Sequence, residues 1–426
     1  MANYDNVKSN LENLRKAALE MNTAFLGKEE IIDMMFICAI AQEPLLLFGP
    51  PGTAKSKLVQ HFCDLLGMRS ASVISETEKK TAQDKKVSSP FYFQYLLTPF
   101  TEPDELFGPV DVNLLKDGRF QRINWQWMLP GATVVFLDEV FRGSSAILNS
   151  LLTIINERRF YEAGNSLQAK ASVIFGAANQ PPSREDLAAF YARFPIRVFS
   201  DETKEANLDV LIERGWKLEN IEVRKRLLSD KQRENDLVSP VADCEDLIQV
   251  QRFFAHHWSP IYLNEDGSER WGNSEILQWT NFKKSPVHRA FVDLAASLRV
   301  RRDGGGAARH GTNPYAASWV ALDDRKVIKL LKVMLARALW FAPDRKEVKS
   351  PDHHDAWQPE ICDLLVLKHV WDDSHSAVRD ELAEKVRSTI KEAYIKEQDK
   401  GDRDGGWYRI TNNQNKYPEY KELFGL

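Results

Sequence analysis

Apolar residues recur at helical spacing at the start of the chain. Four of them, three or four positions apart, predict an amphipathic helix over about residues 5–21. A second helix is expected over residues 31–42, which are apolar on most sides and lead into the next predicted element. The residues that define the first helix are Val7, Leu11, Leu14 and Ala18.

Short apolar runs further along predict strands that are buried on both faces of a parallel sheet. They lie at residues 45–48, 91–97, 134–137 and 172–178, and a last one lies within FYARFPIRVF. Helical segments at 57–66 and 146–156 alternate with these strands. This order is typical of the α/β class, with a doubly wound parallel sheet.

The segment LLLFGPPGTAKS joins the first strand to a helix. Gly49 and Gly52 permit backbone angles that other residues avoid, so successive N–H groups can surround a phosphate. Lys55 would reach the β- and γ-phosphates and Ser56 would bind Mg²⁺, at the positive end of the helix. Ala54 stands where the usual pattern has glycine, and a methyl group in the first turn of a helix is sterically mild. The expected nucleotide-binding residues are Gly49, Pro50, Pro51, Gly52, Thr53, Ala54, Lys55, Ser56 and Lys57.

Polar side chains also end two later strands. Asp138 and Glu139 follow the run at 134–137, and Asn179 follows the run SVIFGAA. Ligands gather at the carboxyl ends of strands in open parallel sheets, so these side chains are expected beside the glycine-rich loop. Asp138 is placed to hold Mg²⁺ through water and Glu139 to polarise an attacking water. Asn179 either orients that water or simply ends its strand.

Two hairpins are predicted between these strands. Asp117 and Gly118 lie between two runs of mixed apolar residues within the segment 106–130, which is a hairpin signal. Gly164 and Asn165 form the expected tip of a second hairpin in FYEAGNSL.

Helical spacing dominates the second half of the chain. We expect a nucleotide-binding core over residues 1–200, linker helices over 201–240, and a helical lid over 241–375 with a tryptophan-rich insertion at 256–284. Residues 376–426 form a C-terminal extension. Apolar residues four apart predict a helix there, which serves either lid packing or docking of a partner.

Composition excludes several classes of protein. With 426 residues, 43% hydrophobic and 28% charged, the chain is an ordinary globular protein that can bury a sizeable core. A net charge of −4 argues against nucleic acid as the main partner. Neither a cationic leader nor a membrane-length apolar run occurs, so we expect a cytoplasmic protein. Buried free thiols are expected at Cys38, Cys63, Cys244 and Cys362.

Five segments resemble, in order and spacing, motifs of the MoxR family of AAA+ ATPases, most closely its RavA-like branch. They are GPPGTAKS, VVFLDEVFRG, LLTIINERRF, GAANQPP and YARFPIR. The resemblance covers about residues 22–200, and the alanine in the phosphate loop is a usual variant in that family. It implies an AAA+ αβα nucleotide-binding domain with a parallel sheet and a smaller all-helical lid. ATP and Mg²⁺ are the implied ligands, and the family inserts a hairpin before the Asp-Glu strand, within a helix that faces a central pore.

The resemblance also implies roles for individual residues. Lys55 and Ser56 correspond to Walker A residues, Asp138 and Glu139 to Walker B residues, and Asn179 to the first sensor.

Arginines carry the remaining implied roles. Arg193 is the implied arginine finger, which acts on the nucleotide of a neighbouring subunit. Arg197 is the alternative, because Ala192 stands where the family more often has aspartate. Arg325, in the first turn of a lid helix, matches the second sensor.

A hexameric ring that hydrolyses ATP to remodel or mature a protein complex is the function that the resemblance implies. The family often works with a partner that carries a von Willebrand factor A (VWA) domain. Two alternatives stay open. A nucleic-acid-dependent motor of the MCM-like type shares the inserted hairpins, and Lys116, Arg119 and Arg122 supply basic residues near one of them. A nucleotide-gated scaffold that does not hydrolyse ATP is the other.

Overall fold

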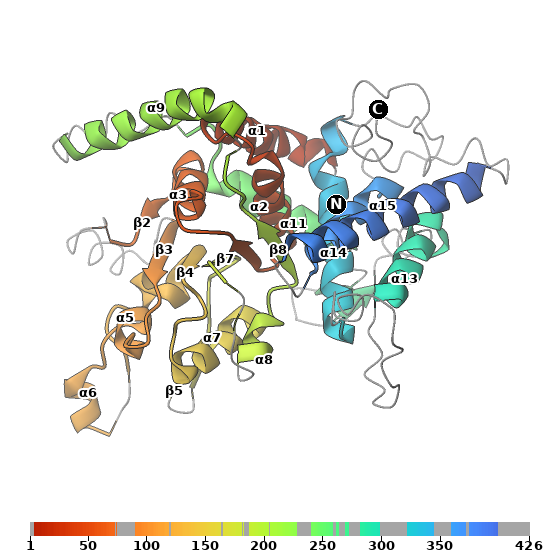
Figure 1. Cartoon of the computed structure of the whole chain (residues 1–426). Helices are drawn as coiled ribbons and strands as arrows, with labels where there is room; N and C mark the ends of the chain where they lie inside the picture. The colour runs from red at the N-terminus through yellow and green to blue at the C-terminus, as the bar shows by residue number, and fades with distance from the viewer. Residues whose placement is uncertain are drawn as a thin grey trace, which may run out of the picture. The chain divides into compact units, whose positions relative to one another are not determined.

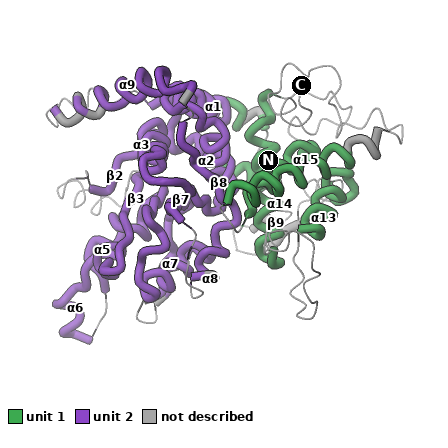
Figure 2. Tube along the Cα trace, viewed as in Figure 1, with its two compact units in different colours: residues 1–9, 249–426 green, residues 10–248 purple. Residues whose placement is uncertain are grey.

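The chain forms two compact units, shown in different colours in Figure 2. The sheet unit comprises residues 10–248, and the helical unit comprises residues 1–9 and 249–426. The structure is a computed structural model, and it describes residues 4–72, 74, 90–118, 121–162, 165–180, 182, 187–203, 205–227, 240–258, 261–263, 269–271, 282–298, 322–344, 359–371 and 375–398.

The sheet unit is built on a six-stranded sheet in the order β2-β3-β4-β7-β1-β8, in which all neighbouring strands are parallel (Figure 1). Every residue of β1 and β7 is buried, as expected when helices cover both faces. The predicted α/β fold with a parallel sheet is confirmed. The strands are β1 Leu45–Phe48, β2 Arg69–Ser70, β3 Phe91–Leu96, β4 Val134–Asp138, β7 Val173–Ala178 and β8 Ile196–Phe199.

Helices α1, α2, α3, α7 and α9 lie where the sequence predicts helices. Helix α2 contacts β1, β7 and β8, and α3 contacts β4 and β7. The four apolar residues that predicted the first helix are all buried in α1. These helices are α1 Tyr4–Ala24, α2 Glu29–Ala41, α3 Lys55–Leu65, α5 Pro103–Phe107, α6 Val112–Lys116, α7 Ser145–Glu157, α8 Ala188–Tyr191 and α9 Leu208–Leu227, with 3₁₀ turns η1 Trp125–Trp127, η2 Leu129–Gly131 and η4 Glu205–Asn207.

The predicted hairpin around Asp117–Gly118 is wrong, because helix α6 precedes that turn. The carboxylate of Asp111 accepts hydrogen bonds of 2.9 and 3.2 Å from two backbone N–H groups of the helix's first turn. Antiparallel pairing among the described residues near this turn is limited to one bridge between Val110 and Arg122. A capped turn of helix, with no buried face to define a strand register, replaces the expected strands.

The second predicted hairpin is present. Strands β5 (Arg159–Glu162) and β6 (Asn165–Gln168) pair antiparallel, directly after α7. Asn165 is the first residue of β6, and residues 163–164 lie outside the described part of the chain.

The helical unit packs the C-terminal segment into its own core. Helix α15 contacts α13 and η6, and Val378, Leu382, Val386 and Ile390 are each at most 1% exposed. Packing, not docking, therefore accounts for their spacing. Its elements are α11 Cys244–Trp258, which begins in the sheet unit, β9 Ile261–Leu263, β10 Glu269–Trp271, α13 Pro286–Leu298, α14 Asp324–Trp340, η5 Ala342–Asp344, η6 Ile361–His369 and α15 Ser376–Gln398.

Several further expectations can be compared with the structure. The expected closing helix at 363–373 is the nine-residue 3₁₀ helix η6. The four cysteines are buried and free, as expected. No helix in the described part of the chain has the length and apolar character needed to cross a bilayer. The polar segment 76–89, most of the tryptophan-rich insertion and the tail after residue 398 lie outside the described residues.

Candidate functional site

The glycine-rich loop follows β1 and leads directly into α3. Gly49 has a φ of 145°, and a Cβ atom there would lie 2.3 Å from the carbonyl oxygen of Ser200, so only glycine fits. Ser200 follows β8, and its N–H donates to the carbonyl of Phe48 at 2.6 Å. Its hydroxyl also donates to the carbonyl of Thr53 at 2.9 Å. The neighbouring strand end therefore fixes the loop on both sides.

Ala54 has a φ of 64° and a ψ of 18°, in the left-handed region. The expectation that its methyl group lies in the first turn of the helix is wrong, because the helix begins at Lys55. Left-handed backbone costs an L-residue about 1–2 kcal/mol, which is why the usual pattern has glycine at this position.

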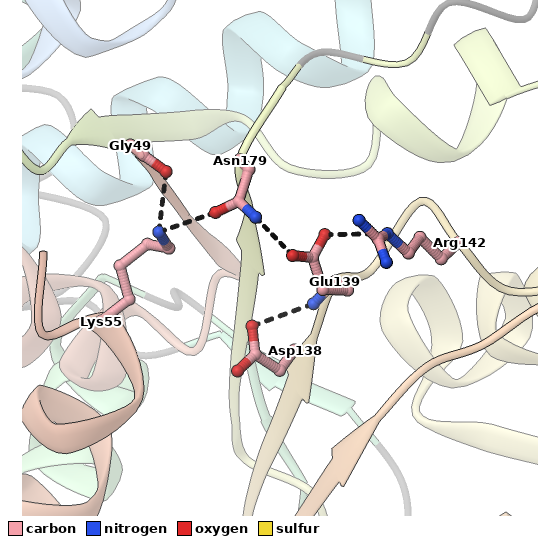
Figure 3. Close-up of polar contacts among 6 residues, drawn as sticks. All are labelled: Gly49, Lys55, Asp138, Glu139, Arg142 and Asn179. Carbon is pink, nitrogen blue, oxygen red and sulfur yellow. Dashed lines mark hydrogen bonds and ion pairs between the residues drawn. The ribbon is translucent and has the colours of Figure 1, made fainter. Parts of the chain in front are cut away.

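The Lys55 ammonium makes three hydrogen bonds at the end of the loop. It donates to the carbonyl oxygen of Gly49 at 2.7 Å and to Oδ1 of Asn179 at 3.0 Å (Figure 3). It also donates to the carbonyl oxygen of Pro50 at 2.9 Å. The residue is only 7% exposed. These contacts hold the ammonium at the loop, where the oxygens of a bound phosphate would compete for it.

Burial lowers the pKa of Lys55, and the nearby carboxylates of Asp138 and Glu139 oppose that shift. Lys28 is a second buried lysine, and its ammonium donates to the carbonyl oxygen of Asp201. Burial lowers the pKa of Lys28 as well; Asp201 opposes the shift and the charge of Lys55 adds to it. Two buried ammonium groups therefore lie beside the carboxylates of this cavity.

Asp138 lies at the carboxyl end of β4 and contacts the start of α3. Its Oδ2 accepts a 2.7 Å hydrogen bond from the hydroxyl of Ser56. Its Oδ1 accepts a 3.0 Å hydrogen bond from the N–H of Glu139, a residue with a φ of 50°. A hydroxyl and a carboxylate in contact are the oxygen ligands that suit Mg²⁺, so Ser56 and Asp138 fit such an ion.

Asn179 joins the two halves of the site, because β7 lies between β1 and β4 in the sheet. Its Oδ1 accepts from Lys55, and its Nδ2 donates to Oε1 of Glu139 (Figure 3). The other carboxylate oxygen of Glu139 pairs with Nε of Arg142 at 3.4 Å. Arg142 lies within the motif VVFLDEVFRG but was assigned no role there, and its side chain is 64% exposed.

A cavity of about 820 Å³ opens over this edge of the sheet. The phosphate loop, Asp138, Glu139 and Asn179 all line it. The sequence did not indicate several other groups that line it, among them the turn after α1, including Lys28, and helix α9. The helix expected to be a linker therefore lines the cavity. Its only signal in the sequence is the presence of apolar residues in an otherwise charged segment.

Lys57 lines the same cavity, but its ammonium forms an ion pair with Glu219 of α9. Both side chains are about half exposed, at 49% and 52%. This contact ties α9 to the first turn of the helix that follows the phosphate loop.

Neither Arg193 nor Arg197 lines this cavity. Arg197 is fully buried on β8; its guanidinium lies 3.8 Å from the Tyr191 ring centroid and donates to the Tyr191 carbonyl at 3.2 Å. Arg193 is half-buried in the turn before β8. Its Nε has no hydrogen-bond acceptor among the described residues. Arg325 is exposed near the start of α14, in the helical unit.

A family model for the MoxR domain in the MoxR-vWA-beta-propeller ternary systems matches residues 12–74 and 79–237, more than half of the chain. The match includes all of α9 and ends at residue 237, so it contains no residue of the helical unit.

Three curated relatives match part of the chain. Two uncharacterised proteins of Methanocaldococcus jannaschii are each 38% identical, one over 188 residues and the other over 185. These alignments cover 44% and 43% of this chain, and 43% of each relative. A structural protein of Acidianus two-tailed virus is 27% identical over 182 residues, 42% of this chain and 26% of the viral protein. The chain spans less than half the length of these curated relatives.

The fold has a counterpart among solved structures. A Cytophaga hutchinsonii protein, described as a candidate ATPase, matches with a TM-score of 0.50 and 12% sequence identity. The match covers 92% of this chain and 96% of that one. It supports the fold, and no more than the fold.

Proposed function

This chain belongs to the family of MoxR domains in the MoxR-vWA-beta-propeller ternary systems, and we propose that it hydrolyses ATP with Mg²⁺ to remodel or mature a protein complex. The observation that carries the proposal is one connected set of contacts at the carboxyl edge of the sheet. Lys55, Asn179 and Glu139 are joined by hydrogen bonds, and Ser56 contacts Asp138 beside them.

Each residue in this set has a role that its chemistry supports. Lys55 neutralises charge on the β- and γ-phosphates, Ser56 and Asp138 hold the metal, and Glu139 accepts a proton from the attacking water. Asn179 orients Glu139 through its amide N–H and keeps Lys55 at the loop through its carbonyl. When bound, Mg²⁺ supplies charge that offsets the negative phosphates.

The direct test replaces Glu139 with glutamine, which keeps the shape and the contact with Asn179 but removes the basic carboxylate. We expect ATP turnover to fall about a hundredfold or more while ATP still binds. Glu12→Gln, at an exposed position of α1, is the matched control and should keep full turnover. If Glu139→Gln turns over ATP at the unaltered rate, the assignment of Glu139 is wrong. If the unaltered protein binds ATP without turning it over, a scaffold that does not hydrolyse ATP is favoured.

A ring is the second part of the proposal. Arg193 is half-buried, whereas Arg197 is enclosed on β8 and stacked on Tyr191. Arg193 is therefore the better candidate for an arginine finger that reaches the nucleotide of a neighbouring subunit. A head-to-tail contact of this kind closes into a ring, and a hexamer is the ring we propose. Arg325 is proposed to sense the γ-phosphate from the helical unit.

The partner follows from the family. The matched domain is described as part of systems that contain a vWA protein and a beta-propeller protein, so we propose a VWA-domain partner for this chain. A protein client completes the proposed assembly. Membership of the RavA-like branch rests on the sequence motifs alone and stays a prediction.

The MCM-like alternative has less support than its sequence suggested. Arg122 is 9% exposed and pairs with Asp104 at 2.6 Å, so it is unavailable to nucleic acid. Lys116 is exposed at the end of α6, and Arg119 lies outside the described residues. Stimulation of ATP turnover by DNA would support this alternative. Turnover that does not respond to DNA but rises with the VWA partner would exclude it.

A further inference from the structure

Helix α9 is held to the rest of the sheet unit on one side. The Arg214 guanidinium donates to the carbonyl of Asn22, near the end of α1, at 2.9 Å. One turn later, Glu219 pairs with Lys57 in the first turn of α3. Among the residues of α9 whose burial the structure describes, none is buried, and each one from Glu219 onward is exposed. Figure 1 shows one end of α9 projecting past α1 and α3. A helix with so little packing gains stability when a further surface covers it.

A second side of α9 carries a row of large apolar side chains. Steps of four, seven and four residues separate them, so they lie within about 60° of one another around a helix of 3.6 residues per turn. They are between 47% and 80% exposed, and none of them lines the nucleotide cavity. Contiguous apolar surface of this kind marks a site of interaction with another protein. The residues of this apolar stripe are Ile212, Trp216, Val223 and Leu227.

The apolar stripe is complementary to itself when two copies of α9 lie antiparallel. Its spacing is the same when counted from either end. Ile212 of one copy therefore lies opposite Leu227 of the other, and Trp216 lies opposite Val223. The indole ring meets a smaller side chain in each central pair, which allows the two helices to pack closely. A two-fold contact of this kind uses the same patch on both copies and is the commonest way in which identical chains associate.

Area and charge agree with a second copy as the occupant. The four side chains offer on the order of 500 Å² on each copy, so the pair would bury on the order of 1,000 Å², the size expected of a small specific interface. Glu219 lies at the middle of the stripe, where the antiparallel arrangement brings it close to its counterpart. Its ion pair with Lys57 offsets this negative charge, so repulsion between the two copies is reduced.

We propose that α9 pairs through the apolar stripe with α9 of a second copy of this chain, in antiparallel orientation. This contact differs from the head-to-tail contact proposed for the ring, because it closes on two copies and cannot extend around a ring. The two contacts are compatible, and pairing of α9 then joins a subunit of one ring to a subunit of another. The inference does not depend on ATP hydrolysis.

Sedimentation equilibrium of the full chain tests the pairing. Trp216→Glu, which places a charge within the stripe, should weaken the association step that doubles the mass about tenfold or more. Ile221→Glu is the matched control, because Ile221 is 43% exposed on the opposite side of α9 and does not line the cavity. It should change that step by no more than about twofold. Equal association of Trp216→Glu and the unaltered protein would overturn the proposal.

Cross-linking tests the orientation. All four native cysteines are buried, so they should not compete with a thiol placed in the stripe. Chains with Ile212→Cys and chains with Leu227→Cys, co-expressed with different tags, should form a disulfide with each other on mild oxidation, because opposed positions lie within disulfide reach. Either variant alone should not, since its two thiols would lie about 22 Å apart, at opposite ends of the pair.

Each other outcome of the cross-linking contradicts part of the proposal. A disulfide formed by each variant alone would overturn the antiparallel orientation. Absence of the disulfide in the mixture would overturn the pairing, and would leave the apolar stripe to a different protein or to another segment of this chain.

Discussion

Ser56 and Asp138 stand 82 residues apart, and the hydroxyl of Ser56 donates a 2.7 Å hydrogen bond to the carboxylate of Asp138. The contact forms because the loop after β1 and the end of β4 reach the same edge of a parallel sheet. It brings together the two oxygen ligands proposed for Mg²⁺.

Replacement of Ser56 by alanine should therefore uncouple nucleotide binding from Mg²⁺. In the unaltered protein, Mg²⁺ is expected to strengthen ADP binding, and Ser56→Ala should reduce that gain about tenfold. Titration of ADP with Mg²⁺ and with a chelator measures the difference. Ser150→Ala, at a half-buried position on α7, is the control. An equal Mg²⁺ effect in both variants would exclude Ser56 as a ligand.

The edge of the sheet was predictable from the sequence because each component is local. Short apolar runs define the strands, and the polar residue that ends each strand follows directly in the chain. Parallel topology then brings Lys55, Asp138, Glu139 and Asn179 to one place. The hydrogen bonds that join Asn179 to Lys55 and Glu139 agree with that prediction of proximity, while the chemical roles stay predictions.

Features that depend on tertiary context were not predictable. The signal at Asp117–Gly118 is common to hairpins and to helix ends, and only the cap from Asp111 decides for a helix. The left-handed backbone of Ala54 follows from loop closure between β1 and α3. The place of α9 depends on Arg214 and Glu219, two ordinary surface charges in a sequence pattern. A contact between two side chains that lie far apart in the chain produces no periodic pattern in the sequence, so such contacts could not be predicted.

Arg193 and Arg197 should respond differently to replacement by alanine. Arg193→Ala should abolish ATP turnover with little loss of nucleotide binding or of thermal stability, because the side chain is proposed to serve a neighbouring subunit. Arg197→Ala should lower the free energy of unfolding by about 2–4 kcal/mol, since it removes a buried cation–π contact and a buried hydrogen bond. Thermal unfolding and ATP turnover, measured on both variants, distinguish the two roles.

An experiment that mixes two inactive variants tests whether Arg193 acts on the nucleotide of a neighbouring subunit. Arg193→Ala protein mixed with Lys55→Ala protein should recover part of the turnover, because some interfaces then combine an intact loop with an intact finger. No recovery, in mixtures shown to form rings, would contradict action between subunits.

The lowered pKa of Lys55 predicts proton uptake when nucleotide binds. Burial lowers this pKa in the free protein, and a phosphate beside the ammonium raises it again. The bound state then holds more protons at alkaline pH, so ADP affinity should fall as the pH rises through the lowered pKa. Below that pKa the ammonium is charged in both states and affinity should be flat. Calorimetry in buffers of different ionisation enthalpy measures the uptake, and Lys28→Met shows how much comes from Lys28.

The ion pair between Lys57 and Glu219 should control how fast nucleotide leaves, because it holds α9 over the cavity. Exposed pairs of this kind contribute about 0.2–1 kcal/mol, so Glu219→Gln should accelerate ADP release about 1.5- to 5-fold. The effect should shrink in high salt, which screens the pair in the unaltered protein. Stopped-flow release of a fluorescent ADP measures the rate.

Glu213 offers a matched control on the same helix. It pairs with Lys217 at 2.5 Å, within α9 itself, so Glu213→Gln changes the charge of the helix equally without loosening it from α3. Release from Glu213→Gln should match the unaltered protein. An equal acceleration in both variants would mean that the net charge of α9, not its attachment to Lys57, governs release. A charge swap, Lys57→Glu with Glu219→Lys, should restore slow release if the attachment itself is the cause.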